Sequence, residues 1–341
     1  MIFIKKIIPK KKKERRIRML DFIAIGGATR DIFFSYDDLK KRRDKESISG
    51  QYLMIPYGEK IVSQNTYYAY GGGAVNSSIG IARLGGRVAA ICSIGKEGTG
   101  SLIHQKLKNE GVVTSMVQRD TKRHTGLSIF ILGKDNEHSG FLERGANDHL
   151  RIKKISYLKR SRWLYITSLT GDSEKLLPEV FDYAKRNGLK IAFNPGSRQI
   201  KSDFSELGEY IQKTDILLLN MDEAEAVLRL KSKNNHRNKR SLLAEIESLG
   251  ATISVVTDAE NGSHAVFQGN VYSQPALKTE VIDTTGAGDS FGSTFSFFIS
   301  KGHSIPSALR LAAINSASVV SKMGAQDGLM SYNQIKRSKW C

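Results

Sequence analysis

Apolar residues along the chain fall into short continuous runs that alternate with segments in which they recur every three or four residues. Continuous runs of Ile, Val and Leu are typical of strands buried on both faces, and the wider spacing is typical of helices. The predicted strands are 20–26, 87–94, 162–169, 189–193, 215–220 and 252–257. The predicted helices are 74–84, 101–110, 174–187, 240–249 and 305–323. This alternation predicts an α/β fold with a mainly parallel sheet, covered by helices on both faces, that binds ligands at the carboxyl ends of its strands.

Two segments, 32–70 and 117–145, break the alternation. They show short strand patterns with turns and no helical pattern between successive strands, namely at 52–56, 60–62, 126–132 and 140–142. The pattern leaves open whether these strands form a small sheet of their own or extend the edge of the main sheet.

Composition narrows the class of protein. A chain of 341 residues with 40% hydrophobic and 25% charged residues can form one large α/β domain or two modest ones. The only cysteines, Cys92 and Cys341, argue against a disulfide framework and for a reducing compartment. Because there is no apolar run of membrane-spanning length and no pattern of a cleaved leader, we expect a cytoplasmic protein with no membrane partner.

The net charge of +18 raises the hypothesis of a nucleic-acid partner. Nine Lys and Arg residues lie within 5–18, and a second basic run covers 229–240. These runs lack interleaved aromatic residues, so we do not expect nucleic acid as a main partner, and anionic substrates fit the charge equally well. We expect residues 1–18 to be a disordered basic tail.

The segment Asp283 to Phe291 (DTTGAGDSF) carries the most informative chemistry. It places two glycines and a carboxylate at the start of an apolar helix. Backbone N–H groups at Gly286 and Gly288 can point at an anion, and the carboxylate of Asp289 can take a proton from a hydroxyl group. In isolation the segment could be an ordinary tight loop. Its chemistry suits phosphoryl transfer from a nucleotide to an alcohol.

DTTGAGDSF resembles the signature of the ribokinase-like (PfkB) family of sugar and nucleoside kinases, and other motifs of that family follow the same order between residues 20 and 328. The resemblance implies a three-layer α/β/α sandwich with a mainly parallel sheet and a small β lid made by 32–70 and 117–145. The kinase domain would cover 19–335, followed by a tail at 336–341. The implied reaction is in-line transfer of the ATP γ-phosphoryl group, with Asp289 as general base and backbone N–H groups of Gly286, Ala287 and Gly288 stabilising charge.

The segment 71–76 (GGGAVN) lies before a predicted helix, as a dinucleotide-binding motif would. Asn76 replaces the third glycine of that motif, and no acidic residue follows at the expected distance. In the resembled family the matching segment binds substrate, which implies that Gly72, Gly73 and Asn76 do so here.

Asp31 follows the first predicted strand in the segment GGATRD. A carboxylate accepts hydrogen bonds from two adjacent sugar hydroxyls, and the resemblance assigns it that role; the alternative is that Asp31 caps a turn. The resemblance also implies a sugar contact for Glu137, with Glu143 as a competing carboxylate.

The resemblance places the nucleotide in the second half of the chain. Asn220 and Glu223 match its N-x-x-E motif, in which the acid organises Mg²⁺ through waters. Thr257 and Gly262 match a loop that borders the nucleotide, although Ala259 stands where the commoner form has a glycine. Asn315 matches a segment that closes over adenine. Asp283, Thr285 and Gly324 would hold a monovalent cation such as K⁺, so the implied cofactors are ATP, Mg²⁺ and K⁺.

We expect the chain to phosphorylate a primary hydroxyl of a small-molecule sugar. The alternative is an adenosine-like nucleoside kinase, because the same motifs occur in both groups and the lid segments are rich in tyrosines: Tyr52, Tyr57, Tyr67, Tyr68 and Tyr70. A third hypothesis is a non-catalytic sensor that uses the same pocket. The lid could also join two copies of the chain into a homodimer.

Overall fold

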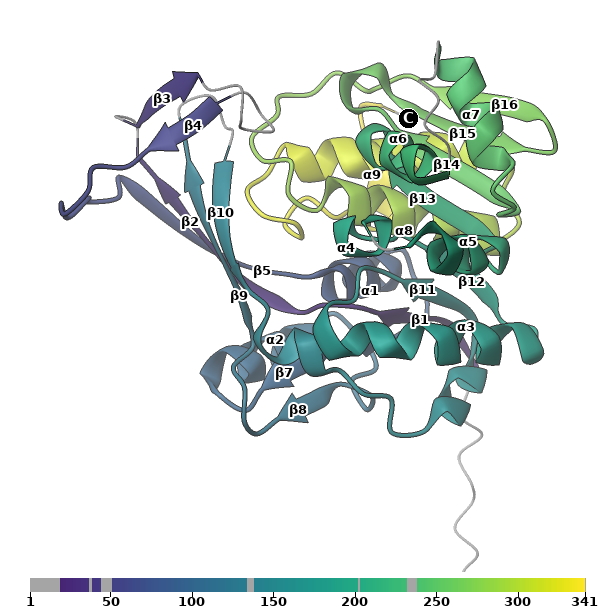
Figure 1. Cartoon of the computed structure of the whole chain (residues 1–341), viewed down its shortest axis with the longest axis horizontal. Coiled ribbons are helices and arrows are strands. Elements are labelled where there is room, and N and C mark those ends of the chain that lie inside the picture. The colour runs from purple at the N-terminus through teal and green to yellow at the C-terminus, as the bar shows by residue number, and fades with distance from the viewer. Residues whose placement is uncertain are drawn as a thin grey trace, which may run out of the picture.

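An eight-stranded sheet runs through the centre of the protein (Figure 1). The structure is a computed structural model, and it describes residues 19–36, 39–43, 51–133, 138–201, 203–231 and 238–340. Six strands are parallel, and the last two form an antiparallel hairpin at one edge. In spatial order the strands are β16 (Asn270–Gln274), β15 (Ser263–Phe267), β14 (Ile253–Thr257), β13 (Ile216–Asn220), β12 (Lys190–Phe193), β11 (Ser161–Ile166), β1 (Leu20–Ile25) and β6 (Val88–Ile91).

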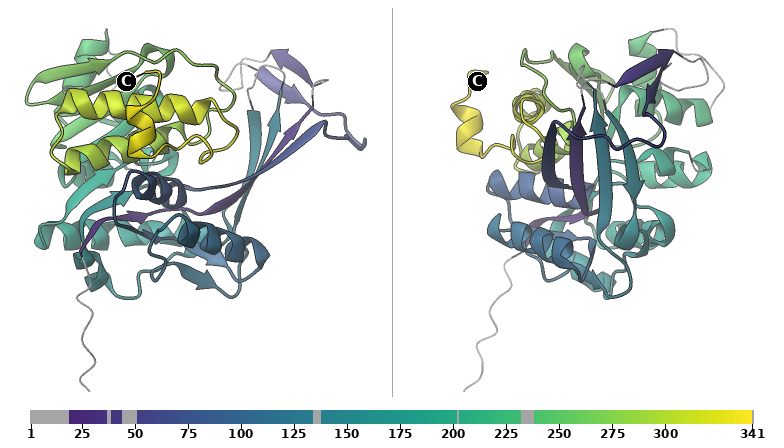
Figure 2. Two further views of the ribbon diagram at one scale, coloured as in Figure 1. Left: turned by 180° about the vertical axis from the view of Figure 1, so that it is seen from behind. Right: turned by 90° about the vertical axis from the view of Figure 1, so that its left-hand side faces the viewer.

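Helices cover both faces of this sheet, because successive strand residues point to opposite sides and both sides are apolar. Phe22 and Ala24 of β1 belong to one buried cluster, whereas Ile23 and Ile25 belong to the other. The first cluster packs under α1 (Gly73–Arg83), α2 (Gly98–Asn109), α8 (Ala287–Ser300) and α9 (Ile305–Val320). The second packs under α3 (Leu176–Arg186), α5 (Phe204–Gln212), α6 (Met221–Lys231) and α7 (Lys239–Glu247). The two helical layers occupy the opposite sides seen in Figures 1 and 2, which confirms the predicted three-layer sandwich.

Shorter helices complete the layers and loops. They are α4 (Ser197–Ile200), α10 (Tyr332–Lys336) and the 3₁₀ helices η1 (Gly145–His149), η2 (Ile155–Arg160), η3 (Gly171–Lys175) and η4 (Ala259–Asn261).

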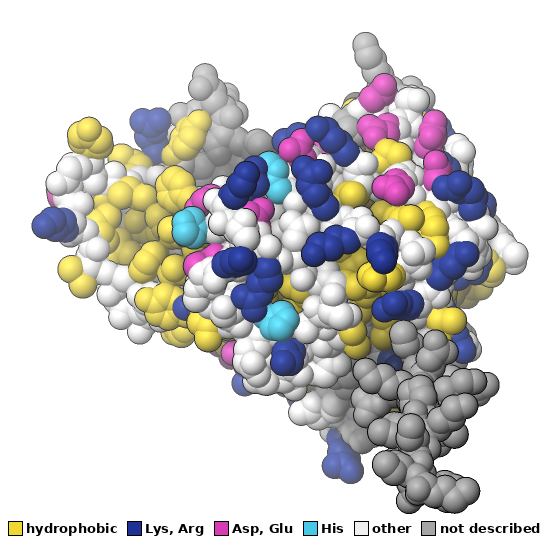
Figure 3. Space-filling model, turned by 90° about the horizontal axis from the view of Figure 1, so that it is seen from below, with side chains coloured by type: hydrophobic (Ala, Val, Ile, Leu, Met, Phe, Trp, Pro, Cys, Tyr) yellow, Lys and Arg dark blue, Asp and Glu magenta, His cyan; other side chains and the backbone are white. Residues whose placement is uncertain are grey.

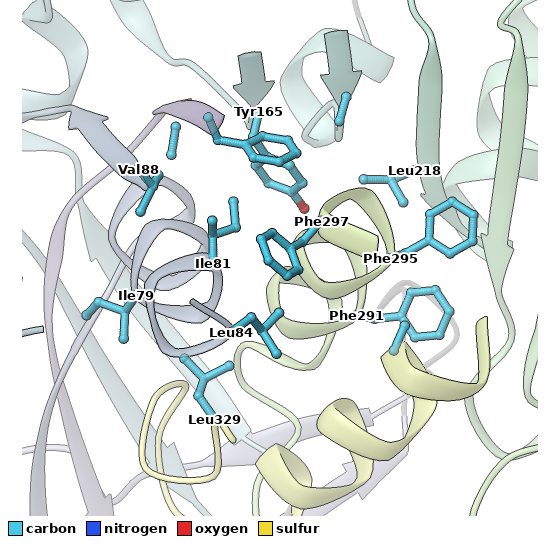
Figure 4. Close-up of a cluster of buried hydrophobic side chains, with 14 of the residues drawn as sticks. Ile79, Ile81, Leu84, Val88, Tyr165, Leu218, Phe291, Phe295, Phe297 and Leu329 are labelled. Atoms are coloured by element: carbon cyan, nitrogen blue, oxygen red, sulfur yellow. The ribbon is translucent and has the colours of Figure 1, made fainter. Parts of the chain in front are cut away.

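Small residues allow α1, α8 and the sheet to pack closely. Figure 4 shows the buried hydrophobic side chains around them. A Cβ added to Gly80 of α1 would lie 3.0 Å from Ser293 Oγ of α8, and one added to Gly292 would meet Leu218 Cδ1 at 2.9 Å. Larger side chains at these positions would push α8 outward. The close packing places the first turns of α1 and α8 side by side.

A separate four-stranded sheet projects from the body of the molecule (Figure 1). Its strands are β10 (His138–Glu143), β9 (Gly126–Leu132), β2 (Thr29–Ser35) and β5 (Asn65–Gly71), in that order. A small pair, β3 (Lys40–Arg43) and β4 (Gln51–Met54), lies beyond it. We call the four-stranded sheet the lid sheet. It does not extend the edge of the main sheet, so the first of the two open alternatives is the observed one.

Several details differ from the sequence-based expectation. The predicted strand 60–62 is not a strand. β8 (Gln118–Asp120), which lies in the second lid segment, pairs instead with β7 (Ser93–Gly95) beside the main sheet. Helix α5 had no counterpart in the prediction. Within the described residues no helix has the length and apolarity needed to cross a membrane.

Candidate active site

The two glycines of the DTTGAGDSF segment differ in why the structure accommodates a glycine there. Gly286 caps α8 with φ at 77°, and a Cβ there would lie 2.7 Å from Ala325 Cα. Gly288 faces open space, since nothing lies within 4 Å of an added Cβ. The N–H of Ala287 bonds the carbonyl of Thr284 at 3.2 Å, whereas Gly288 lies in the first helical turn, whose N–H groups have no partners within the helix. The start of α8 is therefore open to an anion at Gly288.

Asp289, one residue further along α8, receives a hydrogen bond from Asn76 of α1. The distance from Asn76 Nδ2 to Asp289 Oδ2 is 2.8 Å. Burial raises the pKa of Asp289, the negative charge of Asp31 raises it further, and the hydrogen bond from Asn76 opposes both. Asn76 thus supplies a donor that favours the ionised form of the carboxylate, the form that a general base requires.

A cavity of about 220 Å³ lies beside Asp289 at the carboxyl ends of β1, β11 and β12. Hydroxyl, amide and backbone groups make up about half of its wall, and none of its described lining residues is aromatic. The lining residues are Gly27, Thr29, Gly72, Gly73, Arg144, Asn147, Thr167, Ser168, Leu169, Thr170, Asn194, Pro195, Gly196, Glu223 and Asp289. We call this space the first cavity.

A second cavity of about 110 Å³ adjoins the first, because Asn194 and Glu223 line both. Its other lining residues are Leu218, Leu219, Asn220, Val255, Thr257, Gly288, Phe291 and Gly292. Asp289 therefore faces the first cavity, and Gly288 faces the second.

Glu223 is held at the junction of the two cavities by a reciprocal cap of α6. Its Oε2 accepts from the N–H of Asn220 at 2.9 Å, and Asn220 Oδ1 accepts from the N–H of Glu223 at 2.8 Å. Burial raises the pKa of Glu223, Asp222 adds to the rise, and the bond from Asn220 opposes it. Among the described residues no cluster of three or more His, Cys, Asp or Glu could hold a metal. A single carboxylate fits Mg²⁺ only if phosphate oxygens and waters supply the remaining ligands.

Asp31 lies in strand β2 of the lid sheet, and its exposure is 4%. It lies on the same side of this strand as Thr29, which lines the first cavity. Burial raises the pKa of Asp31, and hydrogen bonds from the Ser128 and Thr29 side chains oppose the rise. Its Oδ1 has no hydrogen-bond partner among the described residues. An unpaired buried carboxylate oxygen is costly, so this atom has an unused capacity to accept a hydrogen bond.

Asp283 is buried in the loop that precedes α8. Its Oδ1 accepts from the N–H of Thr285 at 2.9 Å, and its Oδ2 accepts from the N–H of Gly324 at 2.8 Å. The hydroxyl of Thr285 is buried without a partner among the described residues. This set of oxygen atoms fits a hard monovalent cation, and Asp283 and Thr285 would supply the ligands.

Two predicted nucleotide contacts are not brought to the cavities. Asn315 is fully buried: its Nδ2 donates to Thr294 Oγ1 at 2.8 Å, and its Oδ1 accepts from the N–H of Met330 at 2.8 Å. Gly262 has φ at 97°, and a Cβ there would meet the backbone N of Ala276 at 2.8 Å. The internal hydrogen bonds of Asn315 and the positive φ of Gly262 are therefore sufficient to explain these two residue types. Glu137 lies outside the described residues, and its competitor Glu143 is exposed at the end of β10.

The structure adds residues that the sequence analysis did not assign. Asn147 of η1 lines the first cavity, and its amide both donates to and accepts from the backbone of Ala28, at 2.9 Å each. Thr167 and Asn194 directly follow strands β11 and β12. Polar residues immediately after buried parallel strands were an available signal for these two positions.

Comparison with known proteins places the chain in a family. The profile of the pfkB family of carbohydrate kinases matches residues 44–331. A ribokinase of Haemophilus influenzae is 28% identical over 288 residues, which span 81% of this chain and 90% of the relative. The structure of a nucleoside kinase of Methanocaldococcus jannaschii superimposes with a TM-score of 0.76 at 23% identity, covering 94% of this chain and 98% of the other.

A ribokinase of Arabidopsis thaliana, solved with ribose and ATP, superimposes with a TM-score of 0.77 at 21% identity, again covering 94% and 98% of the two chains. These two likenesses establish the fold, and the profile match, which covers well over half of the chain, establishes the family. The chain belongs to the pfkB family and is a ribokinase-like, ATP-dependent carbohydrate kinase.

Proposed function

We propose that the protein transfers the γ-phosphoryl group of ATP to a primary hydroxyl of a sugar held in the first cavity. The observation that carries this proposal is the position of Asp289 and Gly288 at the boundary of the two cavities. Adjacent residues of one helical turn then present a base to the acceptor and a free N–H end to the phosphates.

In this mechanism Asp289 takes the proton of the attacking hydroxyl. The backbone at Gly72 and Gly73 lines the first cavity and would contact the acceptor directly. Asp31 and the amide of Asn76 do not line this cavity and would reach the acceptor after a local movement of the wall. The open N–H end of α8 stabilises charge on the transferring phosphoryl group, with Gly288 closest to the second cavity. Mg²⁺, when bound near Glu223, would neutralise phosphate charge.

A sugar is favoured over a nucleoside because the described wall of the first cavity has hydroxyl and amide groups but no aromatic side chain. Stacking on a base needs an aromatic face. Tyr70 is turned into the protein, where its hydroxyl accepts from Arg30 at 3.3 Å, and Tyr67 and Tyr68 are exposed on the lid sheet. For the nucleoside alternative, lid movement would have to bring these tyrosines to the acceptor.

The lid sheet also supports the proposal of a homodimer. Figure 3 shows hydrophobic side chains gathered on this projecting part of the molecule, in contrast to the charged body. The exposed large hydrophobic residues in the strands of the lid sheet are Tyr67, Tyr68, Phe141 and Leu142. Exposed apolar patches of this kind mark association sites, and sedimentation of the purified protein would show whether it is a dimer.

The proposed function is tested with a panel of sugars and nucleosides. Binding in the presence of ADP and Mg²⁺ should raise the melting temperature, and productive ligands should then support ADP formation from ATP. Asp289→Asn should keep the ligand-induced shift but lower kcat by about 10²–10⁴, the usual contribution of a positioned base. Asp182→Asn, which changes an exposed carboxylate on α3 paired with Lys213, is the matched control. Turnover of Asp289→Asn near the unaltered rate would contradict the proposal, and ligand binding without any turnover would favour the sensor hypothesis.

A further inference from the structure

Behind the candidate base lies a chain of hydrogen bonds that the reaction itself does not require. Asn76 donates to Asp289, and the other end of the same amide, Asn76 Oδ1, accepts from Gln326 Nε2 at 2.9 Å. Gln326 Nε2 also donates to the backbone carbonyl of Tyr70 at 2.7 Å. Gln326 and Asn76 are both buried, at 5% exposure each.

The direction of every bond in this chain is determined by its two ends. The carbonyl of Tyr70 only accepts, so Gln326 must turn its NH₂ group toward it. That same NH₂ group meets Asn76, whose carbonyl oxygen must therefore face Gln326. The NH₂ group of Asn76 is then left to face Asp289, and it can donate only to an ionised or otherwise accepting oxygen.

The backbone of Gln326 is itself anchored to helix α1. Arg83 Nη1 donates to the carbonyls of Gln326 and Leu329, at 2.7 and 2.9 Å. The same guanidinium makes a two-bond ion pair with Glu110, at 2.9 and 2.7 Å. Asn76 and Arg83 are seven residues, or two helical turns, apart on α1, so this helix holds the 326–329 loop at two points. This rigid attachment leaves Gln326 little freedom to present a different atom to Asn76.

We propose that Gln326 is a positioning residue that fixes the Asn76 amide with its NH₂ group toward Asp289 and thereby keeps the base ionised and aligned with the acceptor. The inference rests on the proposed function, since it concerns the same Asp289. Gln326 does not line either cavity, so it acts through Asn76 and not on the substrate.

A pH profile distinguishes this role from a merely structural one. The charged and titratable groups around Asp289 are Asp31 of the lid sheet, Tyr165 of β11, and Glu223 and Arg144 in the cavity wall. Among the described residues, none of these groups forms a hydrogen bond with Gln326. Loss of the donor to Asp289 removes an interaction that favours its ionised form, so the pKa of Asp289 rises. The acidic limb of kcat/KM then moves to higher pH.

The experiment compares Gln326→Met, Gln326→Glu and Gln118→Met. Met keeps the size of Gln326 and removes its donor, whereas an ionised Glu accepts and would turn the Asn76 NH₂ group away from Asp289. Gln118 is the matched control, because its amide makes three hydrogen bonds, to Ser93, His149 and Arg151, and none of these residues lines either cavity. Each variant is assayed for kcat, for the KM of ATP and of the acceptor, for the pH profile and for melting temperature.

We expect Gln326→Met to lower kcat about tenfold and to move the acidic limb upward, with the KM of ATP within twofold, because the loss of one bond to a charged group changes an equilibrium by roughly this factor. Gln326→Glu should show a larger shift in the same direction, and it gives the same test if the Met variant does not fold. Gln118→Met should lower the melting temperature alone. In an Asp289→Asn background, Gln326→Met should cause no further loss of kcat.

An acidic limb and kcat like those of the unaltered protein in a folded Gln326 variant would overturn the inference, whatever happens to the melting temperature. Failure of the proposed function looks different, because Asp289→Asn would then be as active as the unaltered protein. Thus Asp289→Asn tests whether Asp289 is the base, and the Gln326 variants test whether Gln326 orients the Asn76 amide toward it.

Discussion

Gly286→Ala offers the sharpest test of how the loop before α8 is built. Gly286 has φ at 77°, and an added Cβ would lie 2.7 Å from Ala325 Cα, closer than real Cβ atoms approach backbone. The left-handed conformation costs an alanine about 1–2 kcal/mol, and overpacking against backbone adds roughly 1–3 kcal/mol. We therefore expect the free energy of unfolding to fall by about 2–5 kcal/mol.

Catalysis should fall as well, because Ala325 must move to admit the methyl group. Ala325 lies between Gly324, whose N–H bonds Asp283, and Gln326, whose side chain bonds Asn76. Both contacts lead back to the start of α8. A shift of this loop by a fraction of an ångström misplaces Asp289 relative to the acceptor, for which positioning is decisive.

Two glycine variants separate the strain from the catalytic effect. Gly302, after the end of α8, has φ at 83° but nothing within 4 Å of an added Cβ, so Gly302→Ala should cost about 1–2 kcal/mol of stability and leave kcat unchanged. Gly288→Ala should gain about 0.4–1 kcal/mol of stability from lower chain entropy, yet lose activity because its methyl group enters the second cavity. Urea unfolding and steady-state kinetics measure both quantities. Equal stability of Gly286→Ala and Gly302→Ala would refute the argument from close contact.

Three further changes have defined outcomes. Asp31→Ala should raise the acceptor KM by about 10- to 100-fold, the effect of losing a bond worth about 1.5–3 kcal/mol, and leave the KM of ATP unchanged; an unaltered acceptor KM would assign Asp31 a structural role. Ala259 has φ at 43°, a left-handed conformation that a glycine adopts with less strain. In Ala259→Gly the relief of strain opposes the greater entropy of the unfolded chain, so the free energy of unfolding in urea should change by no more than about 1 kcal/mol. A larger loss would contradict this balance. Deleting residues 1–18 should leave kcat unchanged, since every described cavity residue lies at Gly27 or beyond. Salt-sensitive RNA binding that the deletion abolishes would instead support a polyanion partner.

The main fold was predictable because its signals are local. Each buried parallel strand is a continuous apolar run, and each covering helix has its own three- and four-residue spacing. Helix α5 carries the same kind of signal, since Leu207, Tyr210 and Ile211 are buried at three- and four-residue spacing, so this helix was also predictable although it was not predicted. Residues 118–120 were included in the lid segment 117–145, whereas they form strand β8 and pair with β7, because strand pairing depends on tertiary contacts that the local pattern does not contain.

The candidate site shows the same division between local and long-range information. Asp289 and Gly286 stand in one segment, whose chemistry can be reasoned from adjacent residues. Asn76 and Asp289 are 213 residues apart, and Gln326 is 250 residues from Asn76. A carboxylate at a helix start predicts a base, but no local pattern indicates which amide will donate to it. The contact exists because Gly80 permits α1 to approach α8 while Gly292 permits α8 to approach the sheet, so the chemistry of the base also depends on small residues in the interior of the two helices.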